Sequence, residues 1–490
     1  MSSSYEPSKF QFLNDPPVTS RPFSVVVDGE KCIGCGVCIK QCPCQTVEMV
    51  PRKEPSAYQQ AACQYRCPAG TDIRGYLKVI ADGGSLADAW KIIVKTNPMP
   101  AITGRVCPHP CESSCNRTGV DSAVNIHSLE RAVGDHAIEQ GLAFDRPEQD
   151  RKEKIAVVGS GPSGMSCAYQ LAVMGYQVTV FEAAGRAGGM LSRAIPPYRL
   201  PQAVVDHELN RIIDLGVTMK YNTMVGKDIA LDDLKKEYKA IYVALGAQAS
   251  TALGIKGEDG PAIHTGLAFL RSVKENKPLA LGRKVVVVGG GNTAIDAART
   301  ARRMGSEVTV MYRRSAVEMP AHAEEVAAAQ EEGVAIEFLC APVKIPANGK
   351  GRLTCQRMEL GEPDASGRPR PVPVKGSDFE VGYDTLIAAV GQSMTAQGFE
   401  ALLGSSWIGI DDLGRTSVKG VFSGGDAAGG PGLVAEAIGA GRKAALAIDA
   451  FIDGRKVELP VYKEISYADV PLTDRKKIVR NEAGGLAVAQ

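Results

Sequence analysis

The sequence has no surplus of charge of either sign. Its 490 residues include 56 Lys and Arg against 55 Asp and Glu, which leaves a net charge of +1. Proteins that bind nucleic acid or a membrane surface through charge usually carry a basic face, so this balance supports neither kind of partner. No stretch reaches 18 apolar residues, so no transmembrane helix or membrane insertion is expected.

The sequence also lacks the marks of export and of side-chain catalysis. MSSSYEPSKFQF contains no basic segment followed by an apolar core, so we expect a cytoplasmic protein. The six histidines form no metal-ligand spacing, and no Gly-x-Ser-x-Gly motif marks a nucleophile. We therefore expect bound cofactors to supply the chemistry, and no individual catalytic acid or base is predicted.

The sequence does contain 13 cysteines, and ten of them lie in its first 115 residues. Without a secretory signal, this clustering favours metal binding over a disulfide framework. Cys167, Cys340 and Cys355 are scattered, and we expect them to be buried small apolar residues. No Cys-x2-Cys or Cys-x4-Cys pair follows residue 120, which disfavours the chemistry of a disulfide reductase.

The densest cysteine run predicts a [4Fe–4S] cluster. CIGCGVCIKQCP has the Cys-x2-Cys-x2-Cys-x3-Cys-Pro spacing of bacterial ferredoxins, and its ligands would be Cys32, Cys35, Cys38 and Cys42. A zinc site would more often use two separate pairs. Cys42 either closes this cluster or serves a neighbouring one, and Cys44 is spare.

Two glycine-rich loops each follow a strand pattern and open a helix. The same unit of strand, turn, helix and strand is predicted twice, in KIAVVGSGPSGMSCAYQLAVMGYQVTVFEAA (154–184) and in RKVVVVGGGNTAIDAARTARRMGSEVTVMYRR (283–314). Their first glycines are 130 residues apart, which indicates a duplication at the scale of a domain. The fold class expected is therefore α/β, with two Rossmann-like dinucleotide-binding domains.

The first loop is a Gly-x-Gly-x-x-Gly fingerprint. Its glycines allow a tight turn, a close approach of pyrophosphate to the backbone, and packing of helix on strand. Glu182 ends the second strand, where an acid accepts hydrogen bonds from a ribose diol. The expected dinucleotide site comprises Gly159, Gly161, Pro162, Ser163, Gly164 and Glu182.

The second loop is a Gly-x-Gly-x-x-Ala variant. Tyr312 stands where the first unit has Glu182, and Arg313 and Arg314 follow it. A guanidinium pair attracts the 2′-phosphate that a carboxylate would repel, so NADPH is favoured over NADH. The alternative is that these arginines are solvated or paired with acids. The loop residues expected to bind the nucleotide are Gly289, Gly291, Asn292, Thr293 and Ala294.

A late Gly-Asp element indicates which dinucleotide binds to which unit. TSVKGVFSGGDAAGG (416–430) places Gly425 and Asp426 at the end of a strand, where flavoproteins of this type hold the ribityl chain of FAD. The helix that begins near Leu433 and Val434 would direct its dipole at the reduced flavin. Since this element returns after the second loop, the NAD(P) domain must be inserted into the FAD domain.

Several segments share one resemblance: GSGPSG, GGMLSRAIPPYRLP (188–201), GGGNTAIDAART (289–300), VMYRRSAVEMPA (310–321), RMELGEPDASGR (357–368) and FSGGDAAGGPGLVAEAIGAGRKAA (422–445). They resemble the glutamate synthase small subunit family of FAD/NAD(P)H oxidoreductases, which carry N-terminal iron–sulfur clusters, over roughly residues 56–480. The resemblance implies that the PPYRLP segment lies over the flavin and that Arg313 and Arg314 face the NADPH phosphate. It adds to the expected FAD site Gly189, Leu191, Arg199 and Gly246.

The resemblance also implies a helical cluster-binding domain. Its cysteines here would be Cys63, Cys67, Cys107, Cys111 and Cys115, with Glu130 as a non-thiolate ligand by analogy. The family usually has a further Cys-x2-Cys pair and two [4Fe–4S] clusters in this domain, but here SAYQQAA (56–62) contains no cysteine. We expect two clusters in the whole chain, with three as the alternative.

The expected domains are a ferredoxin-like segment (1–55), a helical iron–sulfur domain (56–150), an FAD domain in two parts (151–280 and 385–460), an inserted NAD(P) domain (281–384) and a C-terminal tail (461–490). The expected function is electron transfer between NAD(P)H, FAD, the clusters and a partner, which would be a catalytic subunit or a ferredoxin. One alternative is the glutamate synthase small subunit itself. Another is an iron–sulfur sensor or scaffold with a vestigial flavin fold.

Overall fold

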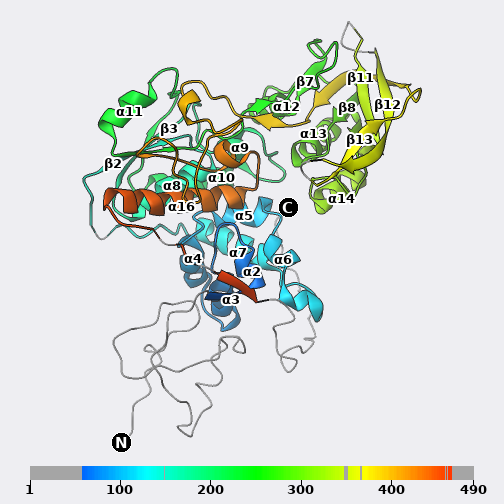
Figure 1. Cartoon of the computed structure of the whole chain (residues 1–490). Helices are drawn as coiled ribbons and strands as arrows, with labels where there is room; N and C mark the ends of the chain where they lie inside the picture. Colours follow the sequence, from blue (N-terminus) through cyan, green and yellow to red (C-terminus); the bar gives the residue numbers. More distant parts are fainter. Residues whose placement is uncertain are drawn as a thin grey trace, which may run out of the picture.

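The structure is a computed structural model that describes residues 58–147, 149–346, 351–364, 367–457, 459–460 and 462–465. The ferredoxin-type run, with Cys32, Cys35, Cys38 and Cys42, lies outside the described residues. Figure 1 shows a helical domain below two α/β units that stand side by side. Within the described ranges, no helix combines the length and the apolar character that crossing a bilayer requires.

In the helical domain, apolar residues recur at helical spacing over residues 73–84, 86–95 and 127–140, and a helix forms in each of these ranges. Asp72 and Ser85 cap two of these helices by accepting hydrogen bonds from backbone N–H groups. The elements are α2 (Ala62–Tyr65), α3 (Ile73–Ala81), α4 (Leu86–Val94), α5 (Pro100–Val106), α6 (Pro110–Ser113), the 3-10 helix η2 (Asn116–Gly119) and α7 (Ile126–Glu139).

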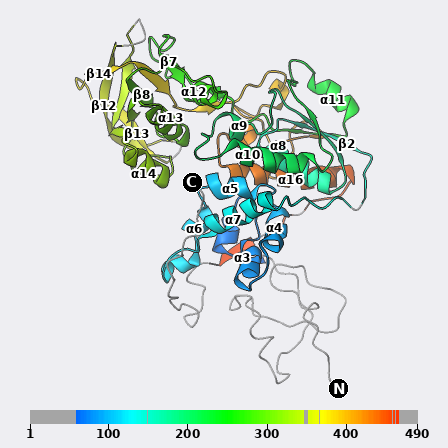
Figure 2. The same ribbon diagram turned by 180° about the vertical axis from the view of Figure 1, so that it is seen from behind.

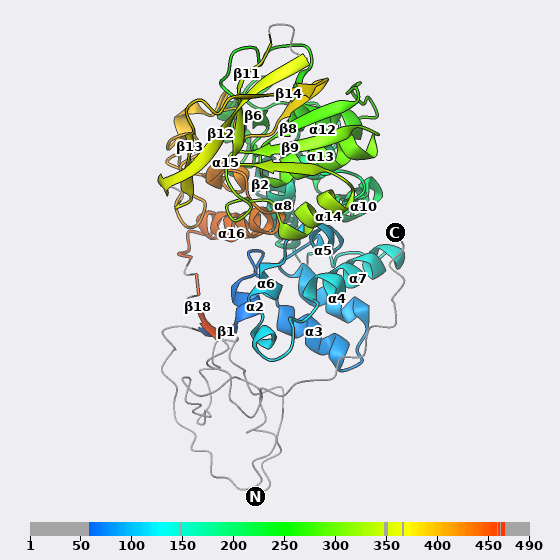
Figure 3. The ribbon, with the colours of Figure 1, turned by 90° about the vertical axis from the view of Figure 1, so that its right-hand side faces the viewer.

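A short parallel strand pair joins this domain to the far end of the chain. β1 (Tyr58–Ala61) pairs with β18 (Tyr462–Ile465), and Figure 3 shows them side by side at the edge of the helical domain. Arg66 binds Glu464 at 2.7 Å, and the side chain of Asn116 donates to the carbonyl of Ile465 at 2.8 Å. Part of the segment expected to be a tail therefore belongs to the folded domain.

The first Rossmann-like unit has a five-stranded parallel sheet in the order β17-β5-β2-β3-β4. Since β17 lies beside β5, the chain returns to this sheet after the second unit, as the Gly-Asp element predicts. The strands are β2 (Lys154–Val158), β3 (Gln177–Phe181), β4 (Thr218–Lys220), β5 (Ala240–Val243) and β17 (Val421–Ser423). The helices are α8 (Pro162–Val173), α9 (Met190–Arg193), α10 (Gln202–Ile213), α11 (Leu231–Glu237), η3 (Glu400–Leu402), α15 (Asp426–Gly429) and α16 (Val434–Ile452).

The second Rossmann-like unit repeats this plan in the order β10-β9-β8-β15-β7. Its strands are β7 (Ile263–Thr265), β8 (Lys284–Val288), β9 (Glu307–Tyr312), β10 (Ala335–Phe338) and β15 (Thr385–Ala388). Its helices are α12 (Gly266–Lys274), α13 (Asn292–Arg303) and α14 (Ala323–Glu331). An antiparallel sheet extends from it, formed by β11 (Cys340–Lys344), β12 (Gly351–Pro363), β13 (Pro369–Pro373) and β14 (Phe379–Tyr383).

The observed sheet is wider than the range 281–384 expected for the inserted domain. β7 and α12 precede residue 281, and β15 follows residue 384, yet both strands are hydrogen-bonded members of the second sheet. The chain crosses between the units through β6 (Ala249–Ser250) and β16 (Gln392–Ser393), which pair in an antiparallel manner. The unit therefore begins and ends at this strand pair.

Candidate active site

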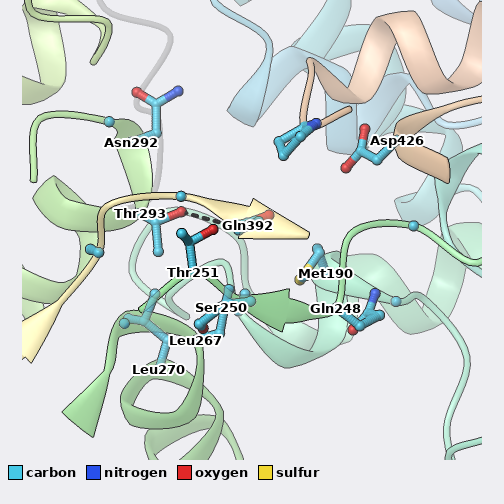
Figure 4. Close-up of a pocket in the computed structure, with 18 of the residues that line it drawn as sticks. Met190, Gln248, Ser250, Thr251, Leu267, Leu270, Asn292, Thr293, Gln392 and Asp426 are labelled. Atoms are coloured by element: carbon cyan, nitrogen blue, oxygen red, sulfur yellow. Dashed lines mark hydrogen bonds between the residues drawn. The ribbon is translucent and has the colours of Figure 1, made fainter. Parts of the chain in front are cut away.

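One large cavity, of about 1200 Å³, lies between the two Rossmann-like units. Both glycine-rich loops line it, and so does the Gly-Asp element. Figure 4 shows Asn292 of the second unit and Asp426 of the first unit on the walls of this cavity. The two expected nucleotide sites are thus parts of one continuous space.

The first loop has the backbone geometry that its glycines predict. Gly159 has φ +100°, and a Cβ there would collide with the carbonyl of Ala244 at the end of β5. A Cβ on Gly164 would collide with the carbonyl of Gly159, whereas one on Gly161 would meet no atom within 4 Å. The space above Gly161, at the start of α8, fits a pyrophosphate on a helix N-terminus.

Glu182 is fixed at the wall of the cavity by three hydrogen bonds. Its Oε2 accepts from the backbone N–H of Ser160 at 3.0 Å and from the Ser160 hydroxyl at 2.6 Å, and its Oε1 accepts from the N–H of Ala184 at 2.8 Å. The side chain is buried. Because Oε1 accepts only one hydrogen bond, it can still accept another from a ribose hydroxyl.

Asp426 follows Gly425, whose φ of +63° and close contact with Ser163 leave no room for a side chain. Burial raises the pKa of Asp426 to about 6, the N–H of Gly432 opposes the rise, and the charge of Glu436 adds to it. Asp426 therefore offers the cavity a polar group that a ligand hydroxyl can stabilise. The other expected FAD residues that line the cavity are Pro162, Gly189, Leu191, Arg199, Gly246, Leu433 and Val434.

The second loop repeats the geometry of the first. Gly289 has φ +143°, and a Cβ there would collide with the carbonyl of Ala389, just beyond β15. A Cβ on Gly291 would meet nothing within 4 Å. The Asn292 side chain is held by His322, whose backbone N–H donates to Asn292 Oδ1 at 3.0 Å. This unit can therefore hold a second pyrophosphate at the start of α13.

The two arginines expected at the nucleotide phosphate have different surroundings. Arg313 is exposed and lines the cavity. Arg314 also lines it but is 3% exposed, and it donates from Nε to the carbonyl of Pro369 at 2.7 Å and from Nη2 to Asp364 at 2.5 Å. Tyr312, which replaces the acid of the first unit, packs its ring on Gly290. Arg313 is thus the arginine of the pair with the more accessible side chain.

The crossover strands contribute residues that the sequence analysis missed. Gln248, Ser250 and Thr251 enter the cavity near β6, and Gln392 enters near β16 (Figure 4). Gln392 donates to the Thr293 hydroxyl at 3.1 Å, which ties this strand to the second loop. Gln248 Oε1 is buried and has no hydrogen-bond partner in the structure. Polar residues just beyond the carboxyl ends of β5 and β15 were the available signal, because ligands bind at that edge of parallel sheets.

Arg199 lies at the cavity wall, and its guanidinium contacts the second unit. Its Nη1 lies 2.9 and 2.8 Å from the two carboxylate oxygens of Asp296, and its Nε lies 3.0 Å from Glu325. Both acids belong to the second unit, on α13 and α14. The position of Arg199 in the chain suggested the flavin alone, but its charge is already paired across the interface.

Three cysteines and Glu130 lie together in the helical domain. Burial raises the pKa of Cys67, Cys107 and Cys111, and their mutual charges and that of Glu130 raise it further. Backbone N–H groups are directed at two of the sulfurs, and the N–H of His109 donates to Cys107 Sγ at 3.4 Å. Such N–H groups are usual around cluster thiolates.

Glu130 is a buried carboxyl without a cation beside it among the described contacts. It accepts hydrogen bonds from Asn97 at 2.8 Å and from Thr103 at 2.7 Å. Burial raises its pKa to about 7, although both hydrogen bonds oppose the rise. Asn97 and Thr103 hold one oxygen of the carboxylate, so the other oxygen is available for iron.

Cys63 and Cys115 form a separate pair. Burial raises the pKa of Cys63 to about 11, and Cys115 is the charge that contributes most to this rise. Among the described residues, no three His, Cys, Asp or Glu side chains converge as closely as a single metal ion requires. A [4Fe–4S] cube has a different requirement, because each of its four ligands binds a different iron. Cys67, Cys107, Cys111 and Glu130 act on one another through their charges, which makes them candidate ligands of such a cluster.

The candidate cluster ligand Cys107 lies next in the chain to a residue of the cavity wall. Val106, the last residue of α5, lines the cavity, and Cys107 follows it directly. The carboxylate of Glu436, in the first turn of α16, acts on the pKa of Cys107. The ligand group therefore lies beside the part of the cavity that is lined by Leu433 and Val434.

The three scattered cysteines are buried, as expected. Cys167 lies in α8, and Cys340 and Cys355 lie in the β11 and β12 strands of the second unit. The pKa of each thiol is raised by burial. Of the three, only Cys340 lines the cavity.

Comparison with family models identifies two regions. Residues 118–236 and 153–441 match pyridine nucleotide-disulphide oxidoreductases. Residues 56–142 match domain II of dihydropyrimidine dehydrogenase, which is described as a 4Fe-4S cluster domain. An FAD/NADPH-binding region and a 4Fe-4S region are therefore both present in the chain.

Comparison with curated proteins finds relatives that are named as NADPH-dependent oxidoreductase subunits. The chain is 40% identical over 435 residues to the beta subunit of the NADPH-Fe(3+) oxidoreductase of Geobacter sulfurreducens, which covers 81% of this chain and 65% of that protein. It is 36% identical over 413 residues to the small chain of NADPH glutamate synthase of Escherichia coli, covering 78% of this chain and 87% of that one. The fold is also that of Mycobacterium tuberculosis FprA in complex with NADPH, with a TM-score of 0.56, 20% identity, and coverage of 62% and 85%.

Proposed function

The chain belongs to the pyridine nucleotide-disulphide oxidoreductases, in the group that includes the glutamate synthase small chain, and from this premise we propose that it is the electron-transfer subunit of a larger oxidoreductase. It would move electrons between NADPH and a partner through FAD and [4Fe–4S] clusters. The observation that carries the proposal is the single cavity, which both nucleotide loops line and which Val106 connects to Cys107.

We assign FAD to the first Rossmann-like unit and NADPH to the second. The carboxylate of Glu182 suits a ribose diol, and Asp426 suits the ribityl chain. The second unit has Tyr312 at the place of the acid and an exposed Arg313 at the cavity, which suits a 2′-phosphate. Gly161 and Gly291 leave the pyrophosphate positions open above the starts of α8 and α13.

When bound, FAD would accept hydride from NADPH and release single electrons to the clusters. The protein positions the two nucleotides and keeps water away from the place where they meet. Leu191, Leu267 and Leu270 supply apolar walls there, and Gln248 offers an unpaired carbonyl oxygen to an amide or imide N–H. No acid or base is required from the protein for hydride transfer itself, in agreement with the lack of a nucleophile motif.

The proposed cluster ligands number eight. Cys67, Cys107, Cys111 and Glu130 would hold the cluster nearest the flavin, and the N-terminal run would hold the other. Cys63 and Cys115 are then left without a cluster of their own, because the usual Cys-x2-Cys partner pair is absent from residues 56–62. Two clusters in total are proposed for this reason.

The partner is proposed to be a catalytic subunit other than the glutamine-using subunit of glutamate synthase. The N-terminal ferredoxin run and the absent Cys-x2-Cys pair distinguish this chain from the pattern of that family. The chain also spans about two thirds, 65%, of the length of the Geobacter beta subunit, so its partners need not be the same. Affinity purification of the complex tests this proposal, and recovery of a glutamine amidotransferase subunit would contradict it.

The function is tested by anaerobic titration of the purified protein with NADPH. We expect the flavin absorbance to bleach and the broad iron–sulfur absorbance to decrease with it. A bleached flavin with unchanged clusters would contradict the electron path, and no bleaching would support a sensor or scaffold instead. The same titration with NADH tests the role of Arg313, since equal or faster reduction by NADH would contradict it.

The cluster ligands are tested with matched variants. We expect about eight iron and eight sulfide atoms per wild-type chain, because two [4Fe–4S] cubes contain that number. Cys107→Ser should lose about half of the iron, whereas Cys63→Ser should keep nearly all of it. Equal loss in both variants would overturn the division of the five cysteines into a cluster group and a spare pair.

A further inference from the structure

The PPYRLP segment of the first unit meets the second unit through two side chains, Tyr198 and Arg199. The segment lies between α9 and α10, and its partners lie on α13 and α14. Arg199 Nη1 binds Asp296 at 2.8 Å, and its Nε lies 3.0 Å from Glu325. The side chains of Arg199 and Asp296 are 10% and 7% exposed, so this ion pair is nearly free of water.

The contacts continue as an alternating chain of charges. Glu325 binds Arg299 as well as Arg199, and Glu332 binds both Arg299 and Arg303 at 2.7 Å. Together with Asp296, the chain contains three acids and three bases, so its charge is balanced. Removing one member would leave a partner charge uncompensated in a partly buried place, where Coulomb energies are larger than in water.

Tyr198 contacts two arginines of α13 through the face of its ring. The guanidinium of Arg303 lies 4.0 Å from the ring centroid, and that of Arg299 lies 4.9 Å from it. The Tyr198 hydroxyl is buried beside Thr300, another residue of α13. The stabilising contact is therefore the attraction of two cations to an aromatic face, which is strongest where water is excluded.

Apart from the contact of Arg199 with Glu325 on α14, the contacts of Tyr198 and Arg199 act on α13, the helix that begins at the second nucleotide loop. Asn292, its first residue, and Asp296, one turn later, both line the cavity. Arg299 and Arg303 lie on the following turns. The first unit thus contacts α13 on successive turns, from Asp296 to Arg303.

We propose that Tyr198 and Arg199 form an interdomain clamp that positions the second unit, and with it NADPH, for hydride transfer. The inference rests on the proposed function, because it concerns the geometry of that same step. Hydride transfer requires the donor and acceptor atoms within about 3 to 3.5 Å, and a misplacement of about 1 Å costs about a hundredfold in rate. Tyr198 and Arg199 are positioning residues, because they act through α13.

The clamp acts on the rate of the step more than on the affinity for NADPH. The nucleotide contacts come from the loop of Gly289–Ala294 and from Arg313, within the second unit. Loosening the clamp leaves that surface intact but lets it shift relative to the flavin. A loss of rate at saturating NADPH, with little change in the half-saturating concentration, is the signature of this arrangement.

The experiment compares Tyr198→Leu with Tyr198→Phe in the full-length protein. In stopped-flow reduction by NADPH, we expect Tyr198→Leu to slow flavin reduction at saturation by about tenfold, because the nucleotides are misaligned. Tyr198→Phe keeps the ring and should stay within about twofold of wild type. The matched control is Arg283→Gln, which breaks an ion pair with Glu307 that is 79% and 51% exposed on the same unit and should change nothing.

A second measurement does not depend on activity. In hydrogen exchange of the oxidised protein without NADPH, Tyr198→Leu should speed exchange in residues 196–201 and in α14, and Tyr198→Phe should not. If Tyr198→Leu is unstable, Arg199→Lys replaces it, since a single ammonium cannot bind Asp296 and Glu325 in the same way.

The outcomes separate the two proposals. If NADPH does not reduce the wild-type flavin, the proposed function fails, and hydrogen exchange still tests the clamp. If wild type and Tyr198→Leu are reduced equally fast, or if Leu and Phe behave alike, the clamp is overturned while the function stands. A change in half-saturating NADPH alone would also overturn it, because it would assign Tyr198 to binding.

Discussion

The first Rossmann-like unit has two neighbours, and it meets them through different kinds of interface. Toward the helical domain the contact is apolar: Ile93 and Ile102 of that domain share one buried cluster with Met165 of α8 and Ile438 of α16. Toward the second unit the contact is the charged clamp, and the second unit has its own clusters, around Phe269 and around Leu353. Figure 2 shows the molecule from behind, with α5 and α7 of the helical domain beside α10 of the first unit, and α5 also beside α16.

The two interfaces suit two different steps of the proposed electron transfer. An electron passes between fixed cofactors, so the proposed cluster ligands and the flavin residues gain from a single shared core. A nicotinamide nucleotide must enter and leave, so its unit gains from a core of its own and from polar contacts that can break and form again. We expect the apolar interface to be the more rigid one.

The largest expected effect comes from breaking the shared core. Trp90 is 3% exposed, stacks on Phe144 at 5.4 Å, and lies under Arg211 of α10 at 5.3 Å. Trp90→Ala should lower the free energy of unfolding by about 3 to 5 kcal/mol through the lost burial and the cavity. Thermal unfolding followed by flavin and iron–sulfur absorbance should show both cofactors lost together.

Phe269→Ala is the matched control for that variant, since Phe269 is equally buried but lies in the second unit. It should destabilise the second unit and leave the cluster absorbance in place. Loss of the cluster in Phe269→Ala to the same extent as in Trp90→Ala would contradict the division into one shared core and one separate core.

A smaller loss of stability is expected where α16 contacts the loop that follows Cys67. A Cβ on Gly439 would collide with the carbonyl of Pro68, the residue after Cys67. Gly439→Ala should force the helix and the loop apart and cost about 1 to 3 kcal/mol, measured by denaturant unfolding. Lys443→Ala, on an exposed face of the same helix, should stay within about 0.5 kcal/mol of wild type.

The free energy of unfolding should depend on pH because of Glu332, an acid in the alternating chain of charges. Burial alone would raise the pKa of Glu332, but hydrogen bonds from Arg303 and Arg299 outweigh it and lower the pKa to about 2. A lowered pKa means that the stabilisation is complete above pH 4.5 and is lost as the pH falls from there toward 2. Glu332→Gln should cost about 1 to 2 kcal/mol at pH 7 and progressively less in acid.

Unfolding of both proteins by denaturant at several pH values measures this difference. A gap between wild type and Glu332→Gln that stays constant from pH 7 to the acid limit would show that the charge of Glu332 contributes nothing to the interface.

The smallest expected effect is on the midpoint potential of the proposed [4Fe–4S] cluster at Cys67. Arg442 of α16 is partly buried, its guanidinium fills the space beside Gly70, and its charge acts on Cys67. A cation near a cluster favours the reduced, more negative form. Arg442→Gln should lower the midpoint potential by an amount on the order of tens of millivolts, measured by redox titration, and Lys443→Gln should not. An unchanged potential in Arg442→Gln would place the cluster away from Cys67.

The sequence predicted those parts of the molecule that depend on local pattern. Both glycine-rich loops, their helices and the return of the chain at Asp426 follow from spacing alone. β7 and β15 were not assigned to the inserted unit, because strands of three and four residues carry too little periodicity. The contacts of Arg314 with Asp364 and of Arg199 with Asp296 join residues 50 and 97 positions apart, so no local pattern could reveal them.

The β6–β16 pair has a mechanical consequence. Both crossings of the chain between the Rossmann-like units run through two residues each, and these four residues are hydrogen-bonded side by side. A ribbon of two antiparallel strands bends across its face far more easily than it shears or stretches. Any rotation of one unit against the other would therefore have to bend this strand pair.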